Sequence, residues 1–305
     1  MRKLRQVVER IENLEALDRP AKSVARVARR VYGGQRVRTV LSGTWLGHPL
    51  HPALSDLPVG FWTAASVLDL AGGDRNAAAA RRLVGLGLVS AVPTAASGTT
   101  DWSTTRDGAQ RVGFVHLVGN VAGIVLQAAS YLARRQNQHA AGRMLGAIGL
   151  GCTSVAAWLG GHLSYVRGVG VGHTAFQAEP TGWIDVAETA DLSPDTPIRV
   201  SASGVPVVLV SRGDKIHALS ATCVHAGGPL DQGTLVDGDC LRCPWHGSVF
   251  RLSDGEAMVG PASTNQPSWE TRVLAGRVQV RMHAGAGGRV PEPRSGEQPV
   301  PSPHP

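Results

Sequence analysis

The sequence predicts a multidomain protein in which an all-α domain of four transmembrane helices is followed by a small all-β domain. Two observations predict this division. The first half is rich in Gly, Ala, Val and Leu and contains long apolar runs. The second half has a mixed composition, and its short β-branched segments are separated by Gly, Asp or Pro, as in small antiparallel domains. A chain of 305 residues can bury a separate core in each part.

Residues 1–44 form a basic arm that carries much of the formal net charge of +7. Apolar residues in this arm recur three or four positions apart and make two helical stripes, separated by a break expected at Pro20. The stripes are Leu4, Val7, Ile11 and Leu14, and then Val24, Val27 and Val31. Such basic amphipathic helices are typical of segments that lie on an anionic membrane surface. Two solvated helices or a short coiled-coil dimer are the alternatives.

Residues 45–166 contain the four expected membrane spans. They are the segments 52–72, 83–100, 112–133 and 144–166. The last two hold no Asp, Glu, Lys or Arg and are long enough to cross about 30 Å of hydrocarbon. The second is shorter, with a kink expected at Pro93, and the first is apolar apart from Asp56 and Asp69. Their many small residues fit closely packed membrane helices, and a soluble bundle is the alternative.

Four spans place both ends of the chain on the same side of the membrane. The basic arm lies on that side, so the excess of Lys and Arg predicts that it is cytoplasmic. We therefore expect a multi-pass protein of the cell membrane, with both termini and the all-β domain in the cytoplasm.

The same topology brings four histidines toward one face of the membrane domain: His48, His51, His116 and His162. On the third span, His116, Asn120 and Gln127 share one helical face, which should point inward because polar groups facing lipid are costly. These histidines could bind a haem, a metal or a quinone headgroup. Alternatively they only hydrogen-bond to backbone or water, with Pro52 at the first helical position and His51 at the cap.

The segment "GHPLHPALSDLPVGFWTAASVLDL" and the three spans after it resemble a family of predicted bacterial membrane proteins of unknown function. The resemblance covers about residues 45–165. It implies a four-span domain in a bacterial membrane and supplies no activity.

The strongest chemical signal is the segment "CVHAGGPLDQGTLVDGDCLRCPWHGSVF". It contains Cys223-x-His225 and then Cys243-x-x-His246. Two thiolates can hold one iron of a 2Fe-2S cluster while two neutral imidazoles hold the other. Zinc bound by Cys240, Cys243 and a histidine is the alternative.

This pattern resembles the Rieske iron-sulfur family over about residues 180–283. The resemblance implies that Cys223 and Cys243 bind the inner iron, and that His225 and His246 bind the outer, solvent-facing iron. Respiratory members of the family carry an additional pair of disulfide-forming cysteines, and this chain has Gly228 and Trp245 at those positions. The difference indicates the ferredoxin-like branch of the family.

The remaining segments complete the domain organisation. Residues 167–180 are expected to form a linker, 181–283 the Rieske 2Fe-2S domain, and 284–305 a disordered Pro-rich tail. Cys152 and Cys240 are expected to be packing residues, and no ligand role is expected for His173.

These features favour a membrane-anchored protein that passes single electrons through its cluster, with the membrane histidines as a second site for electrons. The expected partners are the lipid bilayer and redox donor and acceptor proteins; a homo-oligomer is compatible with the sequence, and no nucleic acid is expected. The chain after His246 is too short for the iron domain of a ring-hydroxylating oxygenase, so an electron carrier or oxidoreductase component is favoured over a self-contained enzyme. A redox-gated transporter or sensor is the alternative.

Overall fold

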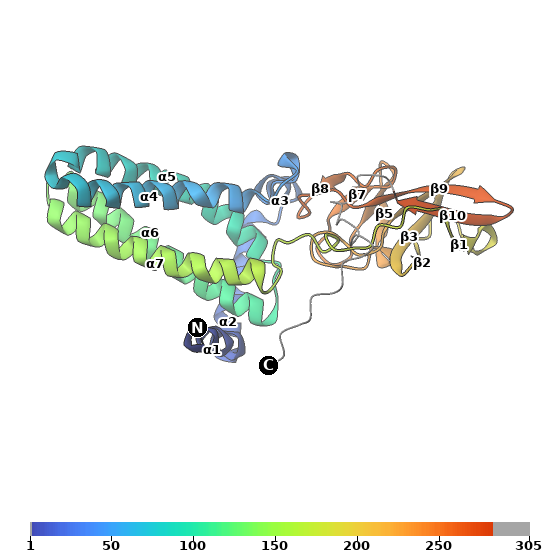
Figure 1. Ribbon diagram of the computed structural model, residues 1–305, viewed down its shortest axis with the longest axis horizontal. Coiled ribbons are helices and arrows are strands. Elements are labelled where there is room, and N and C mark those ends of the chain that lie inside the picture. The colour runs from blue at the N-terminus through green and yellow to red at the C-terminus, as the bar shows by residue number, and fades with distance from the viewer. Residues whose placement is uncertain (1, 283–305) are drawn as a thin grey trace, which may run out of the picture.

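The computed structural model describes residues 2–282. A helical body and a β body lie end to end along the long axis of the molecule (Figure 1). The predicted disordered tail, 284–305, lies outside the described residues.

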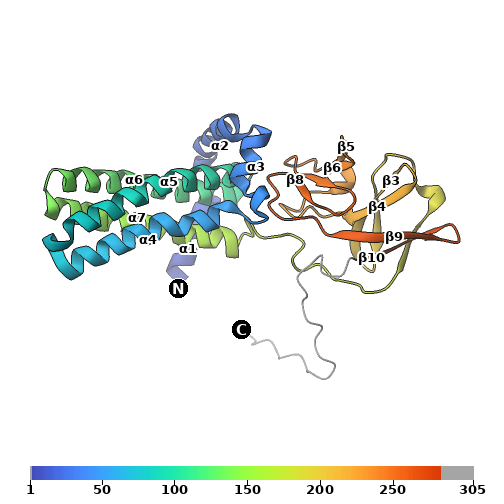
Figure 2. The same cartoon turned by 90° about the horizontal axis from the view of Figure 1, so that it is seen from above.

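Seven α-helices form the helical body within the described residues. They are α1 (Arg2–Asn13), α2 (Asp18–Tyr32), α3 (Gln35–Ser42), α4 (Leu50–Gly72), α5 (Ala77–Trp102), α6 (Asp107–Arg135) and α7 (His139–Tyr165). Helices α4 to α7 run side by side as a long bundle, and α1, α2 and α3 lie at the end of the bundle that faces the β body (Figures 1 and 2).

Three of the four long helices could cross a membrane by length and composition. They span Asp74–Trp102, Asp107–Arg135 and His139–Tyr165. Helix α4 has 23 residues but is not among them, because its two aspartates lower its hydropathy. Many apolar side chains of the bundle point outward; Leu70, Val89 and Val92 are 89%, 72% and 70% exposed.

Small residues allow the helices of the bundle to pack closely. A Cβ atom at Gly123 of α6 would lie 2.3 Å from Thr153 Oγ1 of α7, and one at Gly87 of α5 would lie 2.2 Å from Trp62 Nε1 of α4. Larger side chains at these two positions would therefore push the helices apart. This packing matches the small-residue contacts of membrane helices.

A buried ion pair ties α4 to α6 near the end of the bundle remote from the β body. Arg134 donates two parallel hydrogen bonds to Asp69, at 2.9 and 2.5 Å, and a third to Ser130 Oγ at 3.1 Å. The Arg134 side chain is 2% exposed. The carboxylate and the hydroxyl compensate a guanidinium that has left water, so neither partner can be removed cheaply.

The basic arm packs against the bundle mainly through residues outside the two predicted stripes. In α1, Val8 is buried against Val112 and Leu159, whereas the predicted stripe residue Val7 is half exposed. In α2, the alanines Ala21, Ala25 and Ala28 face the bundle. Alanine permits the closest approach of a helix, so the valine stripe of α2 (Val24, Val27 and Val31) is left pointing outward.

Two helix starts were predicted wrongly. Pro20 does not separate two helices but lies in the first turn of α2, which begins at Asp18. Pro52 likewise is the third residue of α4, which begins at Leu50. Both errors have one cause: the amide groups of a first helical turn have no partner within the helix, so proline is tolerated at several positions there.

The β body consists of two antiparallel sheets. The larger sheet has the order β1-β10-β9-β4-β3-β2 and the smaller the order β5-β6-β7-β8. The larger comprises β1 (Ile184–Glu188), β2 (Ile198–Ala202), β3 (Val205–Arg212), β4 (Lys215–Ser220), β9 (Ser268–Leu274) and β10 (Arg277–Met282); the smaller comprises β5 (Thr234–Val236), β6 (Cys240–Arg242), β7 (Val249–Arg251) and β8 (Ala257–Val259).

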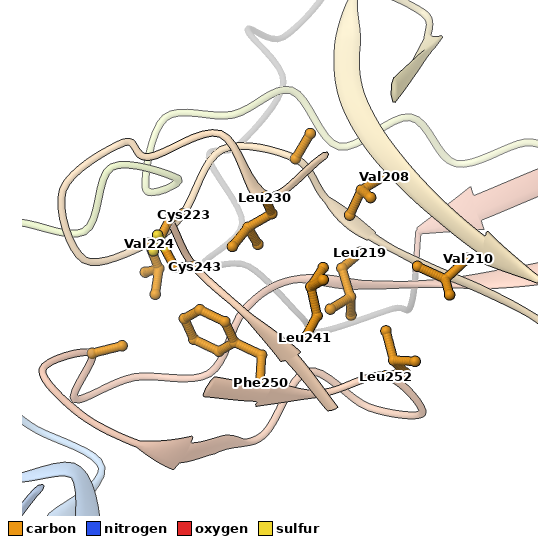
Figure 3. Packing of buried hydrophobic residues seen from close by; sticks show 12 residues of the cluster. Val208, Val210, Leu219, Cys223, Val224, Leu230, Leu241, Cys243, Phe250 and Leu252 are labelled. Carbon is orange, nitrogen blue, oxygen red and sulfur yellow. The ribbon is translucent and has the colours of Figure 1, made fainter. Parts of the chain in front are cut away.

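Both faces of β3 are buried, which explains its continuous apolar sequence. Val208 and Val210 face the core that joins the two sheets, whereas Val207 and Leu209 face a second core on the other side. The first core extends along the smaller sheet through Leu241 and Phe250 to Cys223 and Cys243 (Figure 3).

Polar contacts join the two bodies. Thr44 Oγ1 donates to the carbonyl of Ala262 at 2.8 Å, and the amide of Gly260 donates to Thr39 Oγ1 at 3.3 Å. In the expected linker, the amide of His173 donates to the carbonyl of Val224 at 3.0 Å. The segment that precedes the bundle in the sequence and the segment that follows it therefore both contact the β body.

We expect Asp69→Asn to destabilise the bundle by about 3–5 kcal/mol, because the buried Arg134 charge loses its counter-ion. Asp74→Asn is the matched control at the same end of the bundle: it removes the exposed partner of Arg143 and should cost less than about 1 kcal/mol. Thermal unfolding of both variants in one detergent tests the difference. Equal unfolding temperatures would show that the Asp69 pair has no structural role.

Candidate functional site

Two loops at one end of the first core carry the predicted cluster residues. Cys223 and His225 lie in the loop that follows β4, and Cys243 and His246 lie in the turn between β6 and β7. The two segments are distant in sequence, and the core brings their ends together.

The two loops have the same backbone hydrogen bonds. The amide of Cys223 donates to the carbonyl of Gly228 at 2.8 Å, and the amide of Gly227 donates back to the carbonyl of Cys223 at 2.8 Å. Cys243 repeats the pattern with Ser248 and Gly247, at 2.8 and 3.1 Å. Gly227 and Gly247 have φ angles of +76° and +74°, which glycine adopts without strain. Each loop is thus a closed turn that holds a cysteine at its base.

The two cysteine side chains lie next to each other, and so do the two histidine side chains. Cys223 and Cys243 are buried side by side at the edge of the core (Figure 3). The rings of His225 and His246 lie edge to face, with their centroids 5.1 Å apart. Both imidazoles are half-buried, so the histidine side is more open than the cysteine side.

Burial keeps the two imidazoles neutral at neutral pH. Loss of water lowers the pKa of His225 to about 3, and the neighbouring His246 and Arg38 act in the same direction. Burial also lowers the pKa of His246, assisted by the charges of Arg106 and Arg38, whereas the backbone of Thr104 opposes the shift. Neutral imidazole is the form whose nitrogen can bind a metal.

The two thiols differ, because hydrogen bonding to Cys243 and burial raise the pKa of the Cys223 thiol. The hydrogen bond from Cys223 lowers the pKa of Cys243 to about 6, and the backbone amides of Trp245 and His246 assist. A sulfur that is easily ionised beside a second sulfur suits thiolate binding of iron. The donor set therefore fits a 2Fe-2S cluster, with two sulfurs for one iron and two nitrogens for the other.

The mononuclear alternative fits less well. No group of three or more His, Cys, Asp or Glu side chains within residues 2–282 is arranged to share one metal ion. Cys240, which a zinc site would need, is buried outside the core around Cys243, and its thiol donates to the carbonyl of Gly238 at 3.2 Å.

Gln266 supports the first loop and was not identified from the sequence. Its side-chain oxygen accepts from the amide of Val224 at 2.8 Å, and its nitrogen donates to the carbonyls of Ser220 and Thr222, both at 2.7 Å. The Gln266 side chain is 1% exposed. A single glutamine far along the chain carries no motif, so only the fold could reveal this role.

Gly228 and Trp245, where the additional cysteines of respiratory relatives are absent, lie against each other. A Cβ atom at Gly228 would lie 2.8 Å from Cys243 Sγ and 3.1 Å from Trp245 Cγ. The indole therefore occupies the space beside the ligand loops, and all four cysteines of the chain are free thiols.

The helical body covers the histidine side of the site. His246 and Trp245 line a cavity of about 640 Å³ together with residues of α2 and α3 and the turn between α5 and α6. Arg38 of α3 reaches the second ligand loop, where its Nη2 atom lies 3.4 Å from the position of a Cβ atom on Gly247. His173 of the linker lies beside the first loop, where its Nδ1 atom lies 3.4 Å from the position of a Cβ atom on Gly227. No sequence motif indicated that His173 lies there.

The four membrane-domain histidines are engaged in separate contacts. His51 Nδ1 lies 3.1 Å from the carbonyl of Thr94, and His48 contacts the carbonyl of Pro49. His162 Nε2 lies 3.0 Å from a carboxylate oxygen of Glu12. Each of these three histidines thus has a backbone carbonyl or a carboxylate as its partner.

His116 has contacts at both ring nitrogens. Its Nδ1 lies 2.6 Å from the carbonyl of Ala156, and its Nε2 lies 3.1 Å from Asn120 Nδ2. Asn120 thus faces His116, as the predicted polar stripe requires. Gln127 is buried farther along the same helix, where its amide donates to the carbonyl of Gly146 at 3.0 Å.

Comparison with known proteins shows the family of the β body. Residues 182–270 match the Rieske 2Fe-2S domain family, and ferredoxin CarAc of Metapseudomonas resinovorans is 35% identical over 99 residues, 32% of this chain and 92% of the ferredoxin. The chain therefore belongs to the Rieske family, and its β body is a Rieske domain, which implies a 2Fe-2S cluster. Residues 47–173 match a second family, described as predicted membrane protein (DUF2231).

Two further proteins also align with about a third of this chain. Cholesterol 7-desaturase nvd 1 of Ciona intestinalis is 34% identical over 120 residues, 37% of this chain and 25% of the desaturase, so the chain spans about a quarter of that protein. A solved structure of the ferredoxin of carbazole 1,9a-dioxygenase from Nocardioides aromaticivorans IC177 aligns with 26% identity and a TM-score of 0.32, covering 33% of this chain and 98% of that one.

We expect Gly228→Ala to abolish or strongly reduce cluster binding, because the added methyl group would collide with Cys243 Sγ. Gly182→Ala is the matched control in the same domain, since a Cβ atom there meets nothing within 4 Å. Visible absorbance and iron content of the purified proteins measure the effect. Full cluster occupancy in Gly228→Ala would contradict the close packing of the two loops.

Proposed function

We propose that this protein is a membrane-anchored electron carrier in which Cys223 and Cys243 bind the inner iron of a 2Fe-2S cluster and His225 and His246 bind the outer iron. The observation that carries the proposal is the meeting of two thiols and two neutral imidazoles as like pairs at the ends of two matching loops. The cluster, when bound, supplies one-electron exchange through its histidine-ligated iron.

The protein groups have separate tasks in this proposal. The apolar core excludes water from the cysteine side. The ligand loops hold the four donors in place through their backbone hydrogen bonds, so little rearrangement accompanies the gain or loss of an electron. The imidazoles form the less buried side, and electrons would enter and leave there.

The outward apolar side chains of the bundle support its insertion in a membrane. An exposed surface with residues such as Leu70, Val89 and Val92 suits lipid rather than water. The proposed topology has four spans, α4 to α7, with the basic arm and the Rieske domain on the cytoplasmic side. The apolar face of α2 would then lie on the membrane surface.

A second site for haem, metal or quinone at His48, His51, His116 and His162 stays a prediction. Their hydrogen bonds to backbone and carboxylate oxygens do not require a ligand. Haem absorbance in the purified holoprotein, or a response of the cluster to quinol, would support this second site.

The alternative, a redox-gated transporter or sensor, draws on the buried polar side chains of the bundle. Gln127 and Arg134 are 1% and 2% exposed, and buried polar groups inside membrane helices often mark a pathway. Both also hydrogen-bond to neighbouring helices, as structural residues do. Uptake that persists in a cluster-free variant would favour transport.

We expect Cys243→Ser to remove the electron paramagnetic resonance signal of the reduced cluster and the one-electron activity with an artificial donor and acceptor. Cys240→Ser is the matched control, because its thiol lies only three residues away but contacts Gly238 instead. Electron transfer retained by Cys243→Ser, or lost equally in both variants, would refute the proposed ligand set.

We expect the full chain to remain in the membrane pellet after an alkaline carbonate wash, because a spanning bundle cannot leave lipid without exposing its apolar surface. Protease added to right-side-out vesicles should leave the Rieske domain intact, whereas opened vesicles should not protect it. Release by carbonate would show a peripheral protein, and digestion in closed vesicles would reverse the orientation.

A further inference from the structure

The cavity between the two bodies is lined mainly by the basic arm and the end of the bundle. Its volume is about 640 Å³. Lys22 and Arg29 come from α2, Arg38 from α3 and Arg106 from the turn between α5 and α6, and the cluster loop contributes His246 and Trp245. The cavity thus exists only where these three parts of the chain meet.

Its lining carries a strong positive charge. The described residues around it include four cationic side chains and no carboxylate. Lys22 is paired with Asp18 at 3.0 Å, which leaves the three arginines as the main charges. Arg38 Nε is buried and has no hydrogen-bond partner among the described residues, and an unpaired buried donor of this kind is costly.

The lining of the cavity favours a ligand that accepts hydrogen bonds. The hydroxyls of Thr100 and Ser103 already donate to backbone carbonyls, at 2.9 and 2.8 Å, so guanidinium groups are the main available donors. Arg29 donates one hydrogen bond to the carbonyl of Ser103 at 2.6 Å, and its other N–H groups can donate to a ligand. Planar guanidinium groups pair well with the oxygens of a phosphate.

The position of the cavity favours a lipid as the source of that phosphate. The cavity lies at the end of the bundle next to the β body, and α2, which contributes Lys22 and Arg29 to its lining, also carries the exposed valines Val24, Val27 and Val31. If the bundle spans a membrane, this end lies at headgroup level, where basic pockets between helices bind anionic lipid headgroups. This step rests on the membrane insertion proposed above.

We propose that the cavity formed by Arg29, Arg38 and Arg106 binds the phosphate of an anionic phospholipid headgroup beside His246. A negative charge at this place opposes the gain of an electron by the neighbouring cluster. Occupancy of the cavity therefore lowers the midpoint potential of the cluster and makes it depend on the lipid composition of the membrane.

The test uses the full holoprotein in nanodiscs of phosphatidylcholine, with or without phosphatidylglycerol. Two quantities are measured: phosphatidylglycerol retained per chain, by native mass spectrometry, and the midpoint potential, by a redox titration followed by electron paramagnetic resonance. The test variant is Arg29→Gln/Arg38→Gln. Its matched control, Arg30→Gln/Arg36→Gln, removes the same charge from the same two helices at positions that do not line the cavity.

The wild type and the control should retain phosphatidylglycerol and show a lower potential with it. The test variant should bind it about tenfold or more weakly, which corresponds to the loss of about one charge-assisted hydrogen bond, and its potential should no longer depend on lipid. Arg29→Lys/Arg38→Lys, which keeps the charge, should retain part of the effect. An unchanged unfolding temperature of the test variant shows that it folds.

Three results would overturn the proposal. They are a cluster potential that is the same in both lipids, an equal loss in the test and control variants, which would indicate diffuse surface charge, and a full shift caused by inorganic phosphate in phosphatidylcholine nanodiscs, which would indicate a soluble anion. A protein without a cluster signal would refute the proposed function instead, and lipid retention would still test the cavity.

Discussion

Cys223 and Cys243 lie side by side because two loops from different parts of the chain end at one apolar core, and the remainder of the site depends on this junction. Each loop closes on itself through the same pair of backbone hydrogen bonds. With the cysteines fixed at the loop bases, the histidines two or three residues later have to project from the same end of the domain. The core residues Leu241 and Phe250 (Figure 3) therefore help to fix where the two cysteines meet.

The sequence predicted the parts of this protein whose signals are local. The Cys-x-His and Cys-x-x-His spacings predicted four donors whose side chains the two loops bring close together, and apolar runs identified the helices of the bundle. The β-branched segments 197–202, 205–211, 215–220 and 270–282, which predict strands, coincide with β2, β3, β4, and β9 with β10. Strands β5 to β8 have three residues each, too few for an alternating pattern, so they could be recognised only through their pairing.

Contacts between distant segments could not be predicted. The amide of Gln266 holds the loop of Val224, and Arg38 and His173 lie beside the ligand loops, but none of these residues has a motif. The choice of buried face in α2 follows the same rule. Valine is the more apolar residue, yet Ala21 and Ala25 face the bundle because a close helix contact leaves no room for larger side chains.

The hydrogen bonds of Thr39 and Thr44 to the loop at Gly260 and Ala262 have a kinetic consequence. They hold the domain so that its own helices stand in front of His246 and its own linker stands beside His225. If the domain carries electrons as proposed, a redox partner that approaches from solution has to compete with this intramolecular contact, whose effective concentration is high. The frequency with which the domain separates from the helices would then limit the rate of electron exchange with such a partner.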